Sequence, residues 1–284
     1  MADAAVGGEP IDVLDQASPR PRRRKKLSTV LLQAVAPVIV LILFFGGWQL
    51  FVVLTNQPEY LVPAPTVIAK TAVEQANEIL LPAAWETLKE IIGGFLLAVA
   101  VGMPLATLIA HSKVAMRALN PLIIASQTIP VIAIAPIFVI WFGFGATPKI
   151  LIAALIAFFP VTINAAAGQQ SVDREARDLM RSLSATRLET FRKLTFPASL
   201  PSTFIGLKQA AVVAVIGAVV GEWAGATEGL GPVILSANAG FQTPTIFAAI
   251  LYLSIIGIAL YLLVALAERL TIPWMRYTTG PSNS

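Results

Sequence analysis

The sequence of 284 residues contains no cysteine and a single histidine, His111. The absence of cysteine excludes disulfides and cysteine-ligated metal sites. Charged residues are scarce, at 13% of the chain, and no Gly-x4-Gly-Lys-Ser/Thr loop is present to cradle a nucleotide phosphate. Because acids, histidines and nucleophiles do not cluster, we expect that the chain is not an enzyme and that it binds no metal or cofactor itself.

Apolar residues make up 56% of the sequence. Several apolar runs reach the roughly 20 residues that a helix needs to cross the hydrocarbon core of a bilayer. We therefore predict an all-α, polytopic membrane protein with about six transmembrane helices. The expected spans cover residues 29–54, 86–110, 119–142, 149–167, 202–220 and 244–270. Residues 66–80 are expected to form a surface helix, and residues 221–243 a glycine-rich connection.

Basic residues are distributed unevenly between the two sides of this topology. Sixteen of the 20 lysines and arginines lie in segments that share a side with the N-terminus. The other side holds only Lys70, Lys89 and Lys149, and Lys208 lies just inside the fifth span. The positive-inside rule therefore predicts that both termini are cytoplasmic. The net charge of +4 is explained by this orientation, and nucleic acid is not an expected partner.

The basic run at residues 20–26 could begin a signal peptide. The apolar run after it is too long for a signal core, however, and no small-residue cleavage site follows. A cytoplasmic tail ahead of the first span is expected instead. The expected segments are a tail (1–28), a first span with an outer loop (29–84), a core domain (85–272) and a C-terminal tail (273–284).

A polar, charge-dense stretch, Val172–Pro201, separates the fourth and fifth spans. Apolar residues recur in it at helical spacing, at Leu179, Met180, Leu183, Leu188, Phe191 and Leu194. Ser184 to Thr186 interrupt the pattern, and Thr186 with Glu189 matches a capping box that starts a second helix. Pro197 is expected to close that helix. The pattern predicts an amphipathic helix-turn-helix that offers a ridge to a soluble partner; a cytoplasmic loop that is merely helical is the other interpretation.

Polar residues and prolines inside the spans are candidates for a translocation pathway. Gln127 has a polar side chain at membrane depth, where such groups face a bundle interior or a cavity. Pro130 and Pro136 remove backbone donors from the third span, either for function or as a packing kink. Asn164 lies close to Pro160 in the fourth span, which repeats the theme of a kink beside a polar group.

The fifth span contributes three further candidates. Gln209 lies near its expected cytoplasmic end, beside Lys208, whose amine is expected to extend to the membrane interface. Glu222 lies at the other end, where it is an outer gate residue, a contact for a docked protein or a solvated helix end, the last being favoured. In the second span, Glu86, Lys89 and Glu90 are expected to form an interfacial first turn.

The stretch at 172–198, which we call the elbow, resembles the coupling loop of permeases from binding-protein-dependent ABC importers. That motif reads Glu-Ala-Ala-x3-Gly-x9-Ile-x-Leu-Pro. Starting it at Asp178 places Ser184 on the glycine, Leu194 on the isoleucine and Pro197 on the proline. A start at Glu175 gives a literal Glu-Ala but misplaces the proline. Asp-Leu-Met replaces Glu-Ala-Ala, and the serine suggests that no strongly left-handed backbone is needed at the turn.

Two further passages, Gln127 to Gly145 and Val220 to Gly231, resemble permeases of the nitrate, sulfonate and taurine type. The resemblance then covers roughly residues 60–275. The start of the third span, Ser-Gln-x-Ile-Pro, and the run Gly-Leu-Lys to Val-Ile-Gly-Ala-Val-Val-Gly-Glu are most similar to a branch associated with thiamine-precursor pyrimidines and riboflavin.

The resemblance implies a type I ABC importer transmembrane domain in a bacterial inner membrane. Its implied partners are a cytoplasmic ABC ATPase dimer that binds the ATP, an extracytoplasmic substrate-binding protein, a second permease copy that forms a homodimer with this chain, and membrane lipid. The cargo would be a small organic solute, such as a pyrimidine or vitamin precursor or a sulfonate. The implied ATPase-coupling residues are Asp178, Leu179, Met180, Ser184, Ala185, Thr186, Leu194 and Pro197. The pathway candidates remain Gln127, Pro130, Asn164, Gln209 and Glu222.

A secondary transporter or channel that works without an ATPase is the main alternative. Such a protein would usually carry buried ionisable residues in mid-span or inverted repeats. Neither feature is found in the six expected spans, so the importer is favoured.

Overall fold

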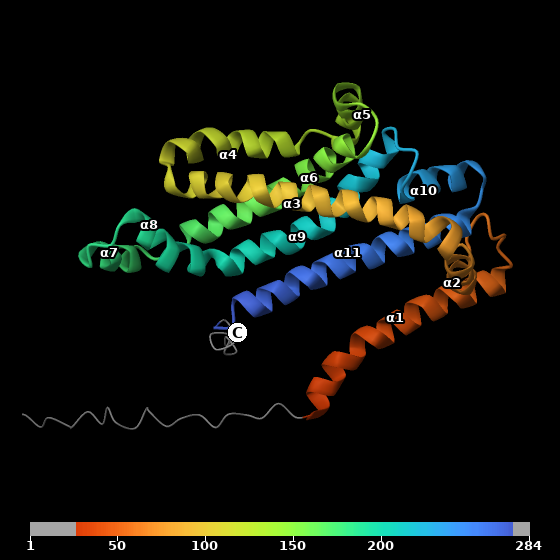
Figure 1. Ribbon diagram of the computed structural model, residues 1–284. Coiled ribbons are helices and arrows are strands. Elements are labelled where there is room, and N and C mark those ends of the chain that lie inside the picture. Colours follow the sequence, from red (N-terminus) through yellow and green to blue (C-terminus); the bar gives the residue numbers. More distant parts are fainter. Residues whose placement is uncertain (1–26, 275–284) are drawn as a thin grey trace, which may run out of the picture. The chain divides into compact units, whose positions relative to one another are not determined.

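The computed structural model describes residues 27–274, which fold into helices with no strand in that range (Figure 1). Five stretches are long and apolar enough to cross a membrane, and α5 and α10 are shorter apolar helices. The predicted all-α membrane fold is thus confirmed. In chain order the elements are α1 (Leu27–Thr55), α2 (Pro65–Glu74), the π-helical turn η1 (Ala76–Leu80), α3 (Leu81–His111), α4 (Lys113–Gln127), α5 (Val131–Phe142), α6 (Ala146–Gln170), α7 (Arg174–Ser182), α8 (Arg187–Thr190), the π-helical turn η2 (Phe191–Thr195), α9 (Phe196–Trp223), α10 (Leu230–Ala239) and α11 (Thr243–Thr271).

The chain divides into two units after Phe51. The first unit contains most of α1, whose side chains from Val35 onward are largely exposed, as expected for a helix surrounded by lipid. The second unit contains all the other helices. The predicted basic and C-terminal tails lie mainly outside the described residues.

The core of the second unit is formed by α3, α6 and α9. Small residues let these helices approach closely, as is common between membrane helices. A Cβ atom on Gly94 of α3 would collide with Ala153 of α6, and one on Gly217 of α9 would lie 2.6 Å from the Ala153 Cα atom. Ala153 is fully buried. One short residue on α6 therefore allows close contact with both neighbouring helices.

The third predicted span, 119–142, is not a single helix. It breaks at Thr128–Pro130, so that α4 ends at Gln127 and α5 begins at Val131. Pro130 has extended backbone angles and directly precedes the first turn of α5. As a proline, it also disfavours helical geometry in Ile129, the residue before it, which favours the end of α4 here. Pro136 lies inside α5 without ending it. The span is therefore divided at Pro130, whereas Pro136 lies within a continuing helix.

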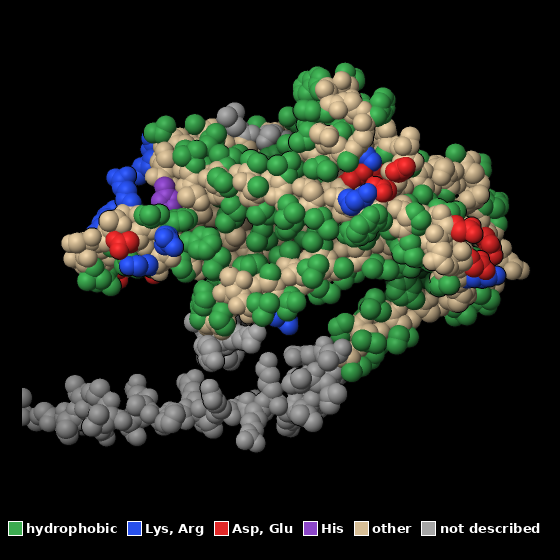
Figure 2. Space-filling model, viewed as in Figure 1, with side chains coloured by type: hydrophobic (Ala, Val, Ile, Leu, Met, Phe, Trp, Pro, Cys, Tyr) green, Lys and Arg blue, Asp and Glu red, His purple; other side chains and the backbone are tan. Residues whose placement is uncertain are grey.

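The two long connections contain helices. The predicted surface helix at 66–80 is present as α2 and η1. Residues 221–243 contain the helix α10, although the sequence predicted only a glycine-rich connection. In the second unit the visible charged side chains gather over α7 and α8 and at the opposite end of the helices, and the surface between them is mainly hydrophobic (Figure 2).

Candidate functional site

The helices of the second unit define two ends, which carry different groups of candidate residues (Figure 1). At the elbow end, α3 and α6 finish and α9 begins. At the far end, α3 and α6 begin, α9 finishes and α10 follows. α6 runs in the same direction as α3, since Lys149 pairs with Glu90 at one end and Gln169 bonds Thr107 at the other.

The capping box predicted in the elbow is confirmed. The backbone N–H of Thr186 donates to the Glu189 carboxylate at 2.9 Å, and the Glu189 N–H donates to the Thr186 hydroxyl at 3.2 Å. These bonds from Thr186, followed by the one from Lys193, lower the pKa of the exposed Glu189 carboxyl to about 2. The start of α8 is therefore fixed by local contacts.

The expectation for Ser184 is wrong. Its φ is +56°, in the left-handed region. The Ser184 N–H donates to the carbonyl of Arg181 at 2.9 Å, and the Ala185 N–H donates to the carbonyl of Met180 at 3.0 Å. This pair of bonds is a Schellman motif, which ends a helix through one left-handed residue, usually glycine. The serine thus adopts the backbone geometry that the motif's glycine would supply.

The expectation for Pro197 is also wrong, because the helix continues from Arg187 to Trp223. Pro197 lies in the first turn of α9. The π-helical turn η2, at Phe191–Thr195, comes directly before it. A π-turn widens the helix, so the proline ring and its missing N–H are accommodated without a break. The elbow is therefore continuous with a helix that reaches the far end.

The apolar residues of the elbow divide into two groups. Leu179 and Leu183 are 61% and 68% exposed, and no side chain of the described chain covers them. Phe191 instead packs against the ring of His111 at 5.6 Å between centroids. Of the predicted coupling residues, Leu194 and Pro197 are half-buried near α9, and the others lie on α7, in the turn or at the start of α8. The exposed group therefore comprises Leu179 on α7, Leu183 at the C-cap of α7 and Leu188, 64% exposed, on α8.

Asn164 and Gln209, two of the predicted pathway residues, are brought together. The Asn164 amide donates to the Gln209 side-chain oxygen at 3.2 Å and to the Pro160 carbonyl at 2.8 Å. A Cβ atom on Gly206 would collide with that same carbonyl, so the glycine allows α6 and α9 to approach here. The pair forms a polar contact between two membrane helices.

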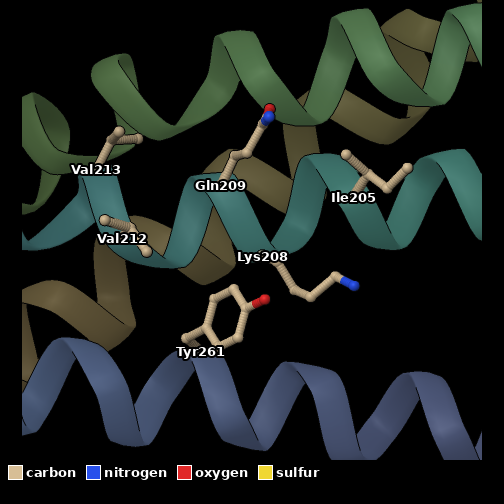
Figure 3. A pocket seen from close by; sticks show the side chains of 6 residues that line it. All are labelled: Ile205, Lys208, Gln209, Val212, Val213 and Tyr261. Carbon is tan, nitrogen blue, oxygen red and sulfur yellow. The ribbon is translucent and has the colours of Figure 1, made fainter. Parts of the chain in front are cut away.

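A groove of about 420 Å³ lies beside this pair, between α9 and α11. In Figure 3, Tyr261 of α11 faces Lys208 of α9, while Gln209 points away toward α6. The Lys208 amine bonds the carboxylate of Glu268, in the last turn of α11, at 2.9 Å. The groove residues are Ile205, Lys208, Gln209, Val212, Val213 and Tyr261.

The five pathway candidates do not form one site. Gln127 is the last residue of α4, and Pro130 precedes α5. Glu222 follows Gln209 by 13 residues on α9, which is about 20 Å along the helix axis. Among the candidates whose side chains the structure describes, Asn164 and Gln209 are the pair joined by a direct bond.

Glu222 is not a solvated helix end, as the sequence had favoured, because it is only 1% exposed. Its carboxylate accepts the hydroxyl of Thr87 on α3 and the N–H of Gly231 in α10, both at 2.6 Å. The Thr87 hydroxyl oxygen in turn accepts the N–H of Leu230 at 2.9 Å. Glu222 therefore fastens the start of α10 to α3 and α9.

A buried ion pair lies in the same region. Glu90 of α3 and Lys149 of α6 are 2% and 8% exposed and bond each other. Sequence reasoning placed Glu90 in an interfacial first turn and Lys149 at the outer start of the fourth span. Glu90 is instead buried, nine residues after the start of α3, and the pairing with Lys149 was not predicted. The missed signal was spacing, since Thr87, Glu90 and Gly94 recur every three to four residues and share the face of α3 that meets α6.

Comparison with known proteins shows similarity over most of the chain. Residues 98–277 match the binding-protein-dependent transport system inner membrane component family. The chain is 36% identical to the formylaminopyrimidine transport permease protein ThiX of Halalkalibacterium halodurans, over 86% of this chain and 97% of that protein. It is 36% identical to the riboflavin transport system permease protein RibX of Chloroflexus aurantiacus, over 91% of this chain and 96% of that one.

The fold also has a solved counterpart. A chain of the MetNI methionine ABC transporter, in an inward-facing conformation, superposes with a TM-score of 0.58 at 16% identity. The match covers 68% of this chain and 96% of that chain. With the sequence matches above, the chain belongs to the binding-protein-dependent transport system inner membrane component family, the permeases of ABC importers.

Proposed function

We propose that this chain forms the translocation pathway of an ATP-driven importer and that the elbow couples it to a separate ATPase. The observation that carries the proposal is the exposed apolar surface of the elbow at one end of the bundle, formed by Leu179 on α7, Leu183 at its C-cap and Leu188 on α8. Exposed leucines among charged residues are typical of a docking surface. The chain has no phosphate-binding loop of its own, so ATP would be bound by the partner.

The continuity between elbow and α9 supports a mechanical role. A displacement at α8 would pass along one unbroken helix from Arg187 to Trp223, about 55 Å at 1.5 Å per residue. Close packing at Gly206 and Gly217 would make α6 move with α9. The motion would reach Glu222 and thus α10 at the far end. Closing of the ATPase dimer would in this way change access at the opposite membrane face.

The polar contact between Asn164 and Gln209 is the best candidate for a position on the pathway. It lies beside the groove, and the positive charge of Lys208 there is paired with Glu268. A largely apolar groove whose one lysine is already paired favours an uncharged cargo over a sulfonate. Relatives named for formylaminopyrimidine and riboflavin transport agree with this choice. We therefore propose a small nitrogen heterocycle as cargo.

The proposed assembly contains two copies of this chain, an ATPase dimer at the elbow end and a substrate-binding protein at the far end. Both chain termini would be cytoplasmic, as the distribution of basic residues predicts. The six basic residues of the elbow are consistent with a cytoplasmic location of the ATPase site.

One observation favours a secondary transporter as a second candidate. Glu90, Lys149 and Glu222 are buried ionisable residues within helices long enough to span a membrane. In secondary transporters such residues bind the coupling ion. Here each of them has a bond to another helix or to α10, which a structural role explains.

The test is uptake by proteoliposomes that contain the chain with the ATPase and binding protein encoded beside it. Labelled formylaminopyrimidine and riboflavin would be supplied with the binding protein outside and ATP inside. Uptake that requires ATP and stops with a non-hydrolysable analogue supports the proposal. Uptake by the chain alone, driven by a proton or sodium gradient, would refute it in favour of the secondary transporter.

A further inference from the structure

Helix α7, which carries the exposed leucines, is held to the helix bundle mainly through Arg177. α7 packs only sparsely on the other helices. Turns precede and follow it, at 171–173 and 183–186, so the backbone links on both sides can bend. Within the described chain, the bond from the Arg177 guanidinium to the Gln169 carbonyl at 2.7 Å is the one side-chain hydrogen bond that joins α7 to a membrane helix.

The carbonyl that Arg177 binds is suited to a cation. Gln169 is in the last turn of α6, where carbonyl groups have no helical partner and carry the negative end of the helix dipole. The positive guanidinium satisfies one of these groups with a charge-assisted bond, which is stronger than a neutral one. The contact is therefore favourable both as a cap and as an ion–dipole interaction.

The contact continues to a second helix. The side-chain amide of Gln169, which is almost fully buried, donates to the hydroxyl of Thr107 on α3 at 3.1 Å. Arg177 is thus connected through one residue to both helices that finish at the elbow end. This route is separate from the covalent route through α8 to α9.

The network also contains groups that this arrangement does not use. Arg177 Nε and Gln169 Oε1 are buried, and neither has a hydrogen-bond partner. One is a donor and the other an acceptor. Both atoms therefore have hydrogen-bonding capacity that no other group of the described residues uses.

We infer that Arg177 is a positioning residue that transmits displacement of α7 to α6 and α3. The inference rests on the proposed coupling to an ATPase. Docking would be performed by the exposed face of α7, and Arg177, on the side toward the bundle, would convert the displacement of the docked helix into movement of the membrane helices. Without Arg177, α7 would bind the ATPase but would pivot on its two turns.

The test compares Arg177→Ala, Arg177→Lys and the control Arg174→Ala in the reconstituted importer. Arg174 is exposed on the same helix, so its removal changes the charge equally without touching the network. We expect Arg177→Ala to retain the ATPase but to lose transport per ATP hydrolysed by roughly tenfold, the factor that about 1.4 kcal/mol gives. Arg177→Lys should recover part of the loss, since an amine can also donate to a carbonyl. Arg174→Ala should equal the wild type.

A second measurement does not depend on transport. The chain has no cysteine, so a spin label on Ser182→Cys, an exposed position at the end of α7, would be the only one attached. Arg177→Ala should increase the mobility of this label, and Arg174→Ala should not.

Three results would count against the inference in different ways. If Arg177→Ala transports as Arg174→Ala does, or leaves the label unchanged, Arg177 does not transmit the motion. If Arg177→Ala releases the ATPase, the residue is part of docking and the inference is wrong. If the wild type itself never retains the ATPase, the proposed function fails, and with it the inference.

Discussion

The carboxylate of Glu222, at the end of α9, accepts the backbone N–H of Gly231 in the first turn of α10 at 2.6 Å. This bond joins two helices that the sequence separates by a loop, and Thr87 on α3 completes it. The sequence favoured a solvated helix end for Glu222, but the residue is buried and links three helices at the far end. It shows how the membrane helices and α10 are connected.

Replacement of Glu222 should loosen α10. In Glu222→Ala the Thr87 hydroxyl and the Gly231 N–H lose their acceptor, at a cost of about 1–3 kcal/mol for each buried group. Glu222→Gln keeps one acceptor oxygen and should lose less. Hydrogen exchange of residues 230–239 and the Tm in detergent would measure the effect. Glu228→Ala, at an exposed position in the same loop, is the control and should behave as the wild type.

Gly231→Ala should be destabilising although it keeps the N–H. A Cβ atom there would lie 2.6 Å from a carboxylate oxygen of Glu222 and 2.8 Å from its Cβ. Overpacking of this kind costs about 1–3 kcal/mol. Gly240→Ala is the matched control at the other end of α10, because its nearest neighbour would be 3.5 Å away and its φ is −89°. A Tm for Gly231→Ala equal to that of the control would contradict the geometry at Glu222.

The buried pair of Glu90 and Lys149 predicts a non-additive double-mutant cycle. Removal of one partner, as in Lys149→Met or Glu90→Gln, leaves a buried group without its partner, which costs about 3–5 kcal/mol when the remaining group is charged. The double variant should recover much of the stability, since a neutral pair leaves no buried charge. Unfolding titrations in mixed micelles would give the coupling free energy. If the losses simply add, the two residues do not stabilise each other.

Ser184 predicts opposite results for two substitutions. Its left-handed backbone costs a residue with a side chain about 1–2 kcal/mol, so Ser184→Gly should stabilise the turn and Ser184→Val should destabilise it. Hydrogen exchange of residues 183–190 would measure both. Ser182→Gly, at the last residue of α7, should instead weaken the helix, by less than the roughly 0.5–1 kcal/mol that a glycine costs in mid-helix. Similar exchange in all three variants would mean that the turn does not require this geometry.

Two features that depend on residues close together in the chain could be predicted from the sequence: the capping box and the long apolar helices. The capping box of Thr186 and Glu189 could be predicted because its bonds span three residues. Apolar runs predicted the long helices for the same reason. Asn164 and Gln209 were both identified as pathway candidates, but their bond depends on α6 and α9 packing side by side.

The wrong predictions have different physical causes. Glu222 was taken as solvated because its partners, Thr87 and Gly231, are on other elements. Pro197 was taken as a helix end because the widened turn before it leaves no clear sequence signal. Ser184 replaces the glycine of the motif, which hid a backbone geometry that the fold still requires.

Co-purification of the chain with its ATPase, comparing wild type, Leu183→Asp and Val114→Asp, tests the central claim most directly. Val114 is the matched control, since it is 78% exposed at the elbow end but lies on α4. An acid placed among the exposed leucines of the elbow should weaken retention of the ATPase by at least about tenfold, as loss of a central interface contact does. Wild type and Val114→Asp should retain it equally. If Leu183→Asp also retains it, or if the wild type never binds it, the elbow is not the coupling site.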